Sequence, residues 1–169
     1  TVIMGAEALA SGSIDMVIAG GMESMTNAPY LLKKHRGGAR AGHDTAYDHM
    51  FLDGLEDAYD GSSMGSFAQA VADEYQLTRE AQDAYSIESL RRAQAAIASG
   101  AFDSEIVAVT VKTRGGDVVV DTDEQPGKGR PDKIPSLKPA FSKDGTITAA
   151  SSSSISDGAA AMVLTRQSV

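Results

Sequence analysis

Three histidines and two aspartates lie close together in one stretch of the chain. His35, His43 and His49 are the only histidines among the 169 residues, and Asp44 and Asp48 stand between the last two. A Ser-His-Asp triad is not expected, because all three histidines share one loop-rich stretch and we recognise no nucleophile elbow around a serine. Metal-ligating histidines usually recur at helix or strand spacing, so solvated or interfacial histidines are the favoured interpretation. The chain also lacks Cys, and we assign it no catalytic residue and no metal ligand.

Two further stretches have residue types that could bind a ligand. Gly20-Gly21 permits close backbone approach at the end of an apolar run, and Glu23 follows between two methionines. A strand-end turn with Met as filler is the ordinary alternative. The quartet Ser151 to Ser154 could present hydroxyls and backbone N–H groups to a polar or phosphate-bearing ligand. Serine-rich turns also commonly satisfy their own backbone, so the quartet alone does not decide.

The helices that would position these residues follow from the apolar periodicity. Helices are expected over Thr1 to Ala10, Ser63 to Tyr75 and Arg79 to Ser99. Thr78 is the expected N-cap of the last helix, and Gly100 lies just past its end.

The expected strands are of two kinds. Ile14 to Ala19 and Gly158 to Thr165 are short and apolar on both faces, which favours buried strands, and the first suits a parallel sheet. Glu105 to Val111 and Asp117 to Asp121 flank Arg114-Gly115-Gly116 and predict an antiparallel hairpin. Buried strands therefore stand near both ends of the sequence, with an α+β insertion between them.

Two stretches are expected to be irregular. Residues 22–61 are rich in glycine and predict a long loop, with a short helix around Asp48 to Leu55. Residues 121–139 contain four prolines, which should prevent regular structure there.

Charge and hydropathy exclude several partners. The chain has 15 Lys plus Arg against 23 Asp plus Glu, a net charge of −8, so nucleic acid is not expected as a partner. No stretch approaches the roughly 20 apolar residues of a membrane helix, so no membrane association is expected. The sequence opens with Thr1, directly in an apolar periodic segment, which suggests a piece of a longer chain.

Several motifs together resemble one known family. They are Ile18-Ala-Gly-Gly-Met-Glu-Ser-Met25 with Asn27-Ala-Pro29, Asp53-Gly-Leu55, Ser63-Met-Gly65, Gln82-Asp-Ala-Tyr85, Leu137-Lys-Pro-Ala-Phe141, Gly145-Thr-Ile-Thr-Ala149 and Ser156-Asp-Gly-Ala159. In order and spacing they are similar to segments of the thiolases, the acetyl-CoA acetyltransferases and 3-ketoacyl-CoA thiolases. The resemblance covers essentially the whole chain.

The resemblance implies an α/β fold and a division of the chain. The chain would be the late part of the N-terminal α/β half of a thiolase, with its inserted α+β loop domain. Residues 1–21 would form a helix and buried strand of that half, residues 22–148 the inserted loop domain that covers CoA, and residues 149–169 the return to the half. Residues 31–44 would correspond to a tetramerisation loop.

The activity implied is that of an acetyl-CoA acetyltransferase, in which a Cys thiol exchanges an acetyl group with CoA. The catalytic Cys and His segments of the family are absent here, so this segment alone is expected to be inactive. Coenzyme A and acyl-CoA would be substrates, with no tightly bound cofactor, in a cytoplasmic dimer or tetramer. A 3-ketoacyl-CoA thiolase of fatty-acid degradation, or a non-catalytic CoA-ester or lipid-binding relative, remains an alternative.

The resemblance also implies which residues bind CoA. By motif position, the pantetheine would pack against apolar residues with one hydroxyl donor, Ser153. The nucleotide would meet an arginine, Arg130, whose guanidinium can stack on adenine or pair with phosphate. The apolar residues are Leu55, Met64, Ala140, Phe141 and Ala149. Ordinary core packing is the alternative for each of them. Ser63 stands where many short-chain thiolases have His, and Ser151 where many have Asn.

Overall fold

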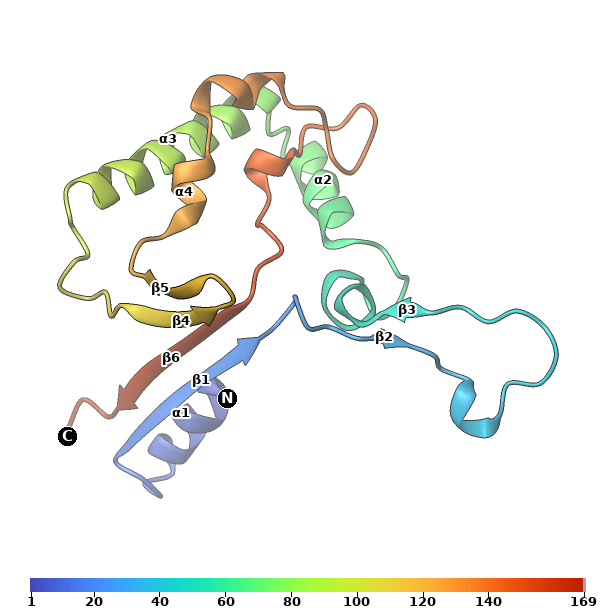
Figure 1. Ribbon diagram of the computed structural model, residues 1–169, viewed down its shortest axis with the longest axis horizontal. Helices are drawn as coiled ribbons and strands as arrows, with labels where there is room; N and C mark the ends of the chain where they lie inside the picture. Colours follow the sequence, from blue (N-terminus) through green and yellow to red (C-terminus); the bar gives the residue numbers. More distant parts are fainter. Residues whose placement is uncertain (169) are drawn as a thin grey trace. The chain divides into compact units, whose positions relative to one another are not determined.

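A computed structural model describes residues 1–168 of the chain (Figure 1). Helices and strands are mixed, and the chain divides into two compact units. Unit 1 comprises Thr1–Ser62 with Ser154–Val169, and unit 2 comprises Ser63–Ser153. The division expected from the resemblance, at residues 21 and 148, stays a prediction.

Unit 1 is built on a helix and two long strands. Helix α1 spans Val2–Ala10, strand β1 spans Met16–Glu23 and strand β6 spans Gly158–Thr165. The two strands pair antiparallel along their whole length, from Met16 opposite Thr165 to Glu23 opposite Gly158. Helix α1 packs on them through its buried residues Gly5 and Leu9.

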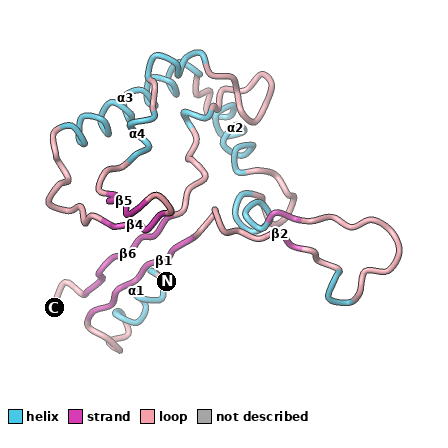
Figure 2. The backbone as a smooth tube through the Cα atoms, in the orientation of Figure 1, coloured by secondary structure: helices cyan, strands magenta, loops and turns pink. Residues whose placement is uncertain are grey.

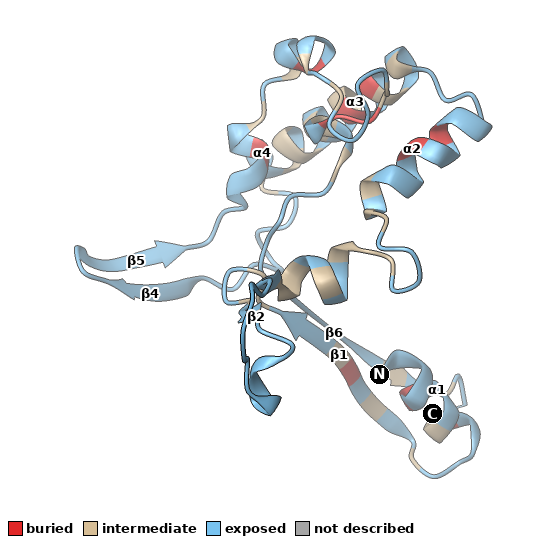
Figure 3. Cartoon of the chain, turned by 90° about the vertical axis from the view of Figure 1, so that its right-hand side faces the viewer, coloured by how far each residue is buried: buried red, intermediate tan, exposed pale blue. Residues whose placement is uncertain are grey.

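The expectation that both strands are buried, and that the first lies in a parallel sheet, was wrong. The neighbour to which β1 is hydrogen-bonded runs antiparallel, and Ala19 is its one buried residue, while Ile18 is 75% exposed. Figure 3 shows most of β1 and β6 in the exposed colour. The physical reason is that α1 covers only one face of this sheet in the described part of the chain. Side chains on the other face therefore stay in solvent, whatever their hydropathy.

The rest of unit 1 is a long excursion closed by two short strands. Strand β2 (Tyr30–Leu31) pairs antiparallel with β3 (Tyr47–Asp48), and a single 3₁₀ turn, η1 (His35–Gly37), interrupts the loop between them (Figure 2). The short helix expected near residue 50 is present as η2 (Phe51–Leu55), which has π-helical hydrogen bonding.

Unit 2 contains the two helices and the hairpin that the sequence predicts. Helix α2 spans Met64–Glu74 and α3 spans Arg79–Ala98, and strands β4 (Val109–Thr113) and β5 (Gly116–Val120) form an antiparallel pair. Thr78 caps α3, since its hydroxyl accepts the Ala81 N–H at 3.2 Å. Gly100 follows with φ of +64°, the left-handed conformation that ends many helices.

The proline-rich stretch is more regular than expected. Residues 124–136 contain a short helix, α4 (Glu124–Lys128), and a 3₁₀ helix, η3 (Pro131–Ser136). A further 3₁₀ turn, η4, spans Ala149–Ser151. Pro126 and Pro131 both lie in the first turn of their helices, where the backbone N–H has no intrahelical partner in any case. Their missing donors therefore cost these short helices nothing.

Candidate functional site

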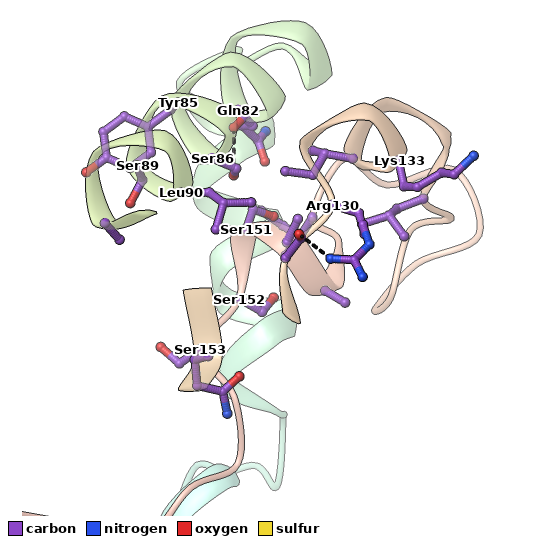
Figure 4. A pocket seen from close by; sticks show the side chains of 18 of the residues that line it. Gln82, Tyr85, Ser86, Ser89, Leu90, Arg130, Lys133, Ser151, Ser152 and Ser153 are labelled. Carbon is purple, nitrogen blue, oxygen red and sulfur yellow. Dashed lines mark hydrogen bonds between the residues drawn. The ribbon is translucent and has the colours of Figure 1, made fainter. Parts of the chain in front are cut away.

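Unit 2 contains a cavity of about 1000 Å³ (Figure 4). Its walls come from α2, α3, α4, η3 and η4, together with the serine-rich turn that follows η4. Ala72, Pro126, Ile134 and Ile147 are the buried apolar residues among those that line it. The cavity therefore combines an apolar floor with polar side chains around it.

One side chain connects α3 to η3, two of the elements that line the cavity. The Arg79 Nε atom donates to both carboxylate oxygens of Asp83, at 2.8 and 2.9 Å. Its Nη2 atom donates to the carbonyls of Ile134 at 3.1 Å and Leu137 at 2.8 Å. Because Asp83 is only 7% exposed, this arginine both neutralises a buried carboxylate and fixes the chain 55 residues away.

Other contacts hold α4 against the same helix. The Gln94 Nε2 atom donates to the Pro126 carbonyl at 2.8 Å. A Cβ atom on Gly129 would lie 2.6 Å from the terminal carbons of the Leu90 side chain, so a larger residue there would require Leu90 to move. The cavity wall that carries Arg130 is thereby fixed relative to α3.

The cations beside the cavity differ in their partners. Lys128 pairs with Glu124 at 2.8 Å, and its hydrogen bond lowers the pKa of the Glu124 carboxyl. Lys133 lies 3.8 Å from Asp132. Arg130 donates to the Gly129 carbonyl at 3.1 Å and, within residues 1–168, has no carboxylate partner. Of these three cations, Arg130 is therefore the one whose positive charge no carboxylate of the described residues neutralises, and it is available to pair with an anionic ligand.

The serine-rich turn uses some of its hydroxyls and leaves one unused. Ser151 Oγ accepts the Thr148 N–H at 2.9 Å, and Ser152 Oγ donates to the Thr148 carbonyl at 2.8 Å. Ser153 lines the cavity, and its hydroxyl makes no hydrogen bond to any described residue. The first two serines therefore shape the turn, and Ser153 is the one with a hydroxyl to offer.

The residues expected to bind CoA fall into three groups. Arg130, Ala149 and Ser153 line the cavity. Met64, Ala140 and Phe141 belong to the same unit and are not among the residues that line it. Leu55 ends η2 in unit 1.

Two of the residues outside the cavity have visible structural roles. The Phe141 ring lies against α2 so closely that a Cβ atom on Gly65 would fall 2.1 Å from it. The Ala140 N–H donates to the Ile147 carbonyl at 2.9 Å and closes the loop between them.

The sequence analysis missed several polar residues of the cavity, and three of them lie on one face of α3. Gln82, Tyr85 and Ser89 project from successive turns of α3 and line it (Figure 4). The Tyr85 and Ser89 hydroxyls make no hydrogen bond to a described residue, and Gln82 Oε1 is buried without a partner there. The motif Gln82-Asp-Ala-Tyr85 and the helical spacing 82, 85, 89 were the available signals, because such residues share one helix face.

Two of the three histidines pair with aspartates in unit 1, and they do so separately. His35 Nδ1 lies 3.0 Å from Asp44, and His49 Nε2 lies 3.2 Å from Asp53. Across residues 1–168 no group of three or more His, Cys, Asp or Glu side chains converges as metal ligands would.

One serine does occupy a Gly-x-Ser-x-Gly pentapeptide that the sequence analysis passed over, Ser63 in residues 61–65. A nucleophile elbow would place this serine between a strand and a helix with a histidine in reach. Instead Ser63 is the N-cap of α2, and its hydroxyl bonds to the Ser66 N–H at 3.3 Å and the Ser66 hydroxyl at 2.9 Å. Its role in the described chain is to start a helix.

The glycine and methionine block lies mostly in β1, which includes Gly20 to Glu23, and a turn follows it at residues 24–27. Asp157 Oδ1 accepts the Thr26 N–H at 2.8 Å, and this bond lowers the pKa of the Asp157 carboxyl. Asn27 Nδ2 donates to Ser24 Oγ at 2.9 Å, and the Ser24 N–H donates to Glu23 Oε1 at 3.1 Å. The polar groups of this block therefore partner one another in unit 1.

No helix among residues 1–168 is both long and apolar enough to cross a membrane.

Comparison with known proteins places the chain in a family. Residues 1–168 match the model of the thiolase N-terminal domain. The chain is 44% identical to an acetyl-CoA acetyltransferase from Saccharomyces pastorianus, over 99% of its own length and 43% of the relative's. It is 46% identical to the mitochondrial acetyl-CoA acetyltransferase FG05087 of Gibberella zeae, over 96% of its length and 38% of the relative's.

A solved structure agrees. The Acat5 thiolase of Ascaris suum, crystallised in complex with coenzyme A, superposes with a TM-score of 0.85 at 44% identity, covering 99% of this chain and 42% of that one. The chain belongs to the thiolase family and has the α/β fold of its N-terminal domain. It spans about two fifths of the length of the relatives it matches.

Proposed function

We propose that this chain is the CoA-binding part of an acetyl-CoA acetyltransferase. The observation that supports it most directly is the cavity of unit 2, which has an apolar floor, an uncompensated guanidinium at Arg130 and an unused hydroxyl at Ser153. Coenzyme A has the matching parts, an uncharged pantetheine arm and a phosphorylated nucleotide. A relative of similar fold that binds coenzyme A adds to this support.

In the proposed reaction the chain binds and orients, and it does not itself attack. An acetyl group would pass from a Cys thiol to the sulfur of CoA, or to the carbanion of a second acetyl-CoA, and the reverse step would cleave acetoacetyl-CoA. The chain holds no Cys, so that thiol would have to come from another part of the complete protein. The chain alone is therefore proposed to be inactive.

The remaining parts of the proposal follow the family resemblance. Residues 31–44 would contribute to a dimer or tetramer, and residues 22–148 would form the inserted loop domain between residues 1–21 and 149–169. CoA and acyl-CoA would be substrates, with no tightly bound cofactor. We propose a cytoplasmic location, with the mitochondrion as the alternative that the name of the Gibberella zeae relative suggests; fractionation of cells that express the tagged protein decides between them.

The nucleotide end of the proposed site is tested in the complete protein that carries this chain. Replacing Arg130 by Ala removes the charge-assisted bonds to phosphate, and we expect the KM for acetyl-CoA to rise about tenfold or more. Arg114→Ala is the matched control, because Arg114 lies in the β4–β5 turn and has no ion pair among the described residues.

A truncated substrate sharpens this experiment. Acetylpantetheine lacks the nucleotide, so its KM should be the same in the Arg130→Ala variant and the unchanged protein. An Arg130→Ala variant with an unaltered KM for acetyl-CoA, or with equal losses for both substrates, would contradict the proposed nucleotide contact.

Ser63 favours a second candidate, a 3-ketoacyl-CoA thiolase of fatty-acid degradation. It stands where many short-chain thiolases have His, and in this structure it caps α2. Comparing turnover of acetoacetyl-CoA with that of longer 3-ketoacyl-CoA esters separates the two enzymes. A non-catalytic CoA-ester or lipid-binding protein would instead bind CoA and give no acyl-enzyme by mass spectrometry after mixing with acetyl-CoA.

A further inference from the structure

The segment Gly145 to Thr148 is held by polar side chains from two different helices. Gln69 of α2 is 7% exposed, and its Oε1 atom accepts the N–H groups of Thr146 at 2.9 Å and Ile147 at 3.2 Å. Gln82 of α3 donates from Nε2 to the Thr146 hydroxyl at 2.9 Å. The side-chain amides of Gln69 and Gln82 are therefore both hydrogen-bonded to Thr146, from which they are 77 and 64 residues distant in sequence.

The amides are themselves fixed. Gln69 Nε2 donates to Asp73 at 2.8 Å, and Gln82 Nε2 also donates to the Leu77 carbonyl at 2.9 Å. A Cβ atom on Gly145 would lie 2.5 Å from Gln69 Oε1, so the backbone approaches this amide as closely as only glycine allows. Residues 145–148 are therefore held by the Gln69 and Gln82 side chains, whose rotamers are themselves restricted by these contacts.

Thr148 connects this hydrogen-bonded segment to the serine-rich turn. It is 0% exposed, its hydroxyl accepts the Ala150 N–H at 3.2 Å, and its own N–H donates to Ser151 Oγ at 2.9 Å. Its carbonyl accepts from Ser152 Oγ at 2.8 Å. The bonds between Thr148 and the first residues of η4 form a capping box, and Ser153 directly follows Ser152 in the chain.

We propose that Thr146 and Thr148 are positioning residues for the Ser153 hydroxyl. They hold the turn in one conformation, so that Ser153 presents its unpaired hydroxyl to the pantetheine of the acyl-CoA before the substrate arrives. This inference rests on the function proposed above and goes beyond it, because neither threonine contacts the substrate. A preformed donor binds more tightly than one that must be ordered on binding.

The experiment compares three variants of the complete protein by their KM and kcat for acetyl-CoA. Ser153→Ala removes the donor and should raise KM about three- to tenfold. Thr148→Val keeps the side-chain shape but loses the hydroxyl that holds Ala150, and should raise KM by the same factor or less. Thr148→Ser restores the hydroxyl and should return KM to within about twofold of the unchanged protein.

A double variant distinguishes positioning from a separate effect. If Thr148 acts through Ser153, adding Thr148→Val to Ser153→Ala should raise KM no further. Additive increases in KM would overturn the inference. Thr146→Val and Thr146→Ser form a second pair, with the same expectation, at the residue that the two amides grip.

Loss of stability is separated from loss of positioning by two further variants. Gly100→Ala puts a side chain on a residue with φ of +64° just past the end of α3 in the same unit, and Gly100 neither lines the cavity nor belongs to the turn, so this variant should lower Tm and leave KM unchanged. If Gly100→Ala raises KM as much as Thr148→Val does, the threonines are merely structural and the inference falls. Should Thr148→Val not fold, Ser151→Ala opens the same capping box from an exposed residue and carries the same expectation.

The outcomes also separate this inference from the proposed function. A Ser153→Ala variant with unchanged KM overturns Ser153 as a CoA contact, and the inference fails with it. A Ser153→Ala variant with raised KM, beside a Thr148→Val variant with unchanged KM, supports the CoA site and overturns the positioning role.

Discussion

The β1–β6 pair of unit 1 and the surroundings of α3 in unit 2 both join segments that are far apart in sequence, and they do so by different bonds. Between β1 and β6 the join is a backbone ladder, with Met16 opposite Thr165 at one end. Around α3 the joins are side chains, with Arg79 reaching the carbonyl of Ile134 and Gln82 reaching Thr146.

The difference teaches which substitutions each region tolerates. A backbone ladder is made by groups that every residue except proline has, so it depends little on side-chain identity. A side-chain bridge depends on one residue type at one position, and removal of that residue leaves buried polar groups unsatisfied. Single substitutions should therefore be more damaging around α3 than along β1 and β6.

The largest effect is expected for Arg79→Ala. It leaves the buried Asp83 carboxylate without its cation and frees the carbonyls of Ile134, Pro135 and Leu137, which should lower the free energy of unfolding by about 3 kcal/mol or more. Arg91→Ala is the control on the same helix, since Arg91 is exposed and pairs only with Glu88 at the surface. Urea unfolding of the chain measures the free energy of unfolding of both variants. Similar losses for the two would contradict the expectation that side-chain bridges around α3 are especially sensitive to substitution.

A smaller effect is expected where a side chain cannot be added to the ladder. A Cβ atom on Gly20 would lie 2.2 Å from the Ala160 carbonyl oxygen, so Gly20→Ala should push the strands apart at a cost of about 1–3 kcal/mol. At Gly21 the same atom would meet nothing within 4 Å. Hydrogen exchange of the β6 amides should accelerate in Gly20→Ala and stay unchanged in Gly21→Ala; equal behaviour of the two would contradict the described register.

The smallest effect is expected at a surface ion pair that bridges no distant segments. Hydrogen bonds from Arg91 and Arg92 lower the pKa of Glu88 from its ordinary 4.5 to about 2. Because the pKa is depressed in the folded chain, the contribution to stability is present above pH 4.5 and is lost as the pH falls towards 2. The Tm difference between the unchanged chain and Glu88→Gln should be small at pH 7 and should shrink over that window. A difference that grows on acidification would refute the assignment.

Much of the fold could be predicted because its signals are local. The N-cap at Thr78, the glycine after α3 and the turn between β4 and β5 each act within a few residues. The existence of β1 and β6 was predicted as well. Their pairing and exposure were not, because these depend on what covers each face of the sheet. The helices α4 and η3 were not predicted, because the prolines were taken to prevent helices, whereas Pro126 and Pro131 lie in first turns, where proline is tolerated.

The candidate site divides in the same way. Motifs indicated Arg130, Ala149 and Ser153, and all three line the cavity. The bridges made by Arg79 and Gln82 have no local signature, since their partners lie more than 50 residues away and any polar side chain on a helix is usually solvated. Geometry was needed to find them.

The β4–β5 hairpin has a practical consequence for anyone who purifies this chain. All ten of its strand residues are exposed, five of them are valines, and Lys112 and Asp117, which lie opposite each other, are the only charged ones. Exposed strand edges pair readily with those of other molecules, and a lysine on the edge opposes this. Protein and salt concentration will therefore determine how fast a preparation aggregates, and Val119→Lys is the first substitution to try against aggregation.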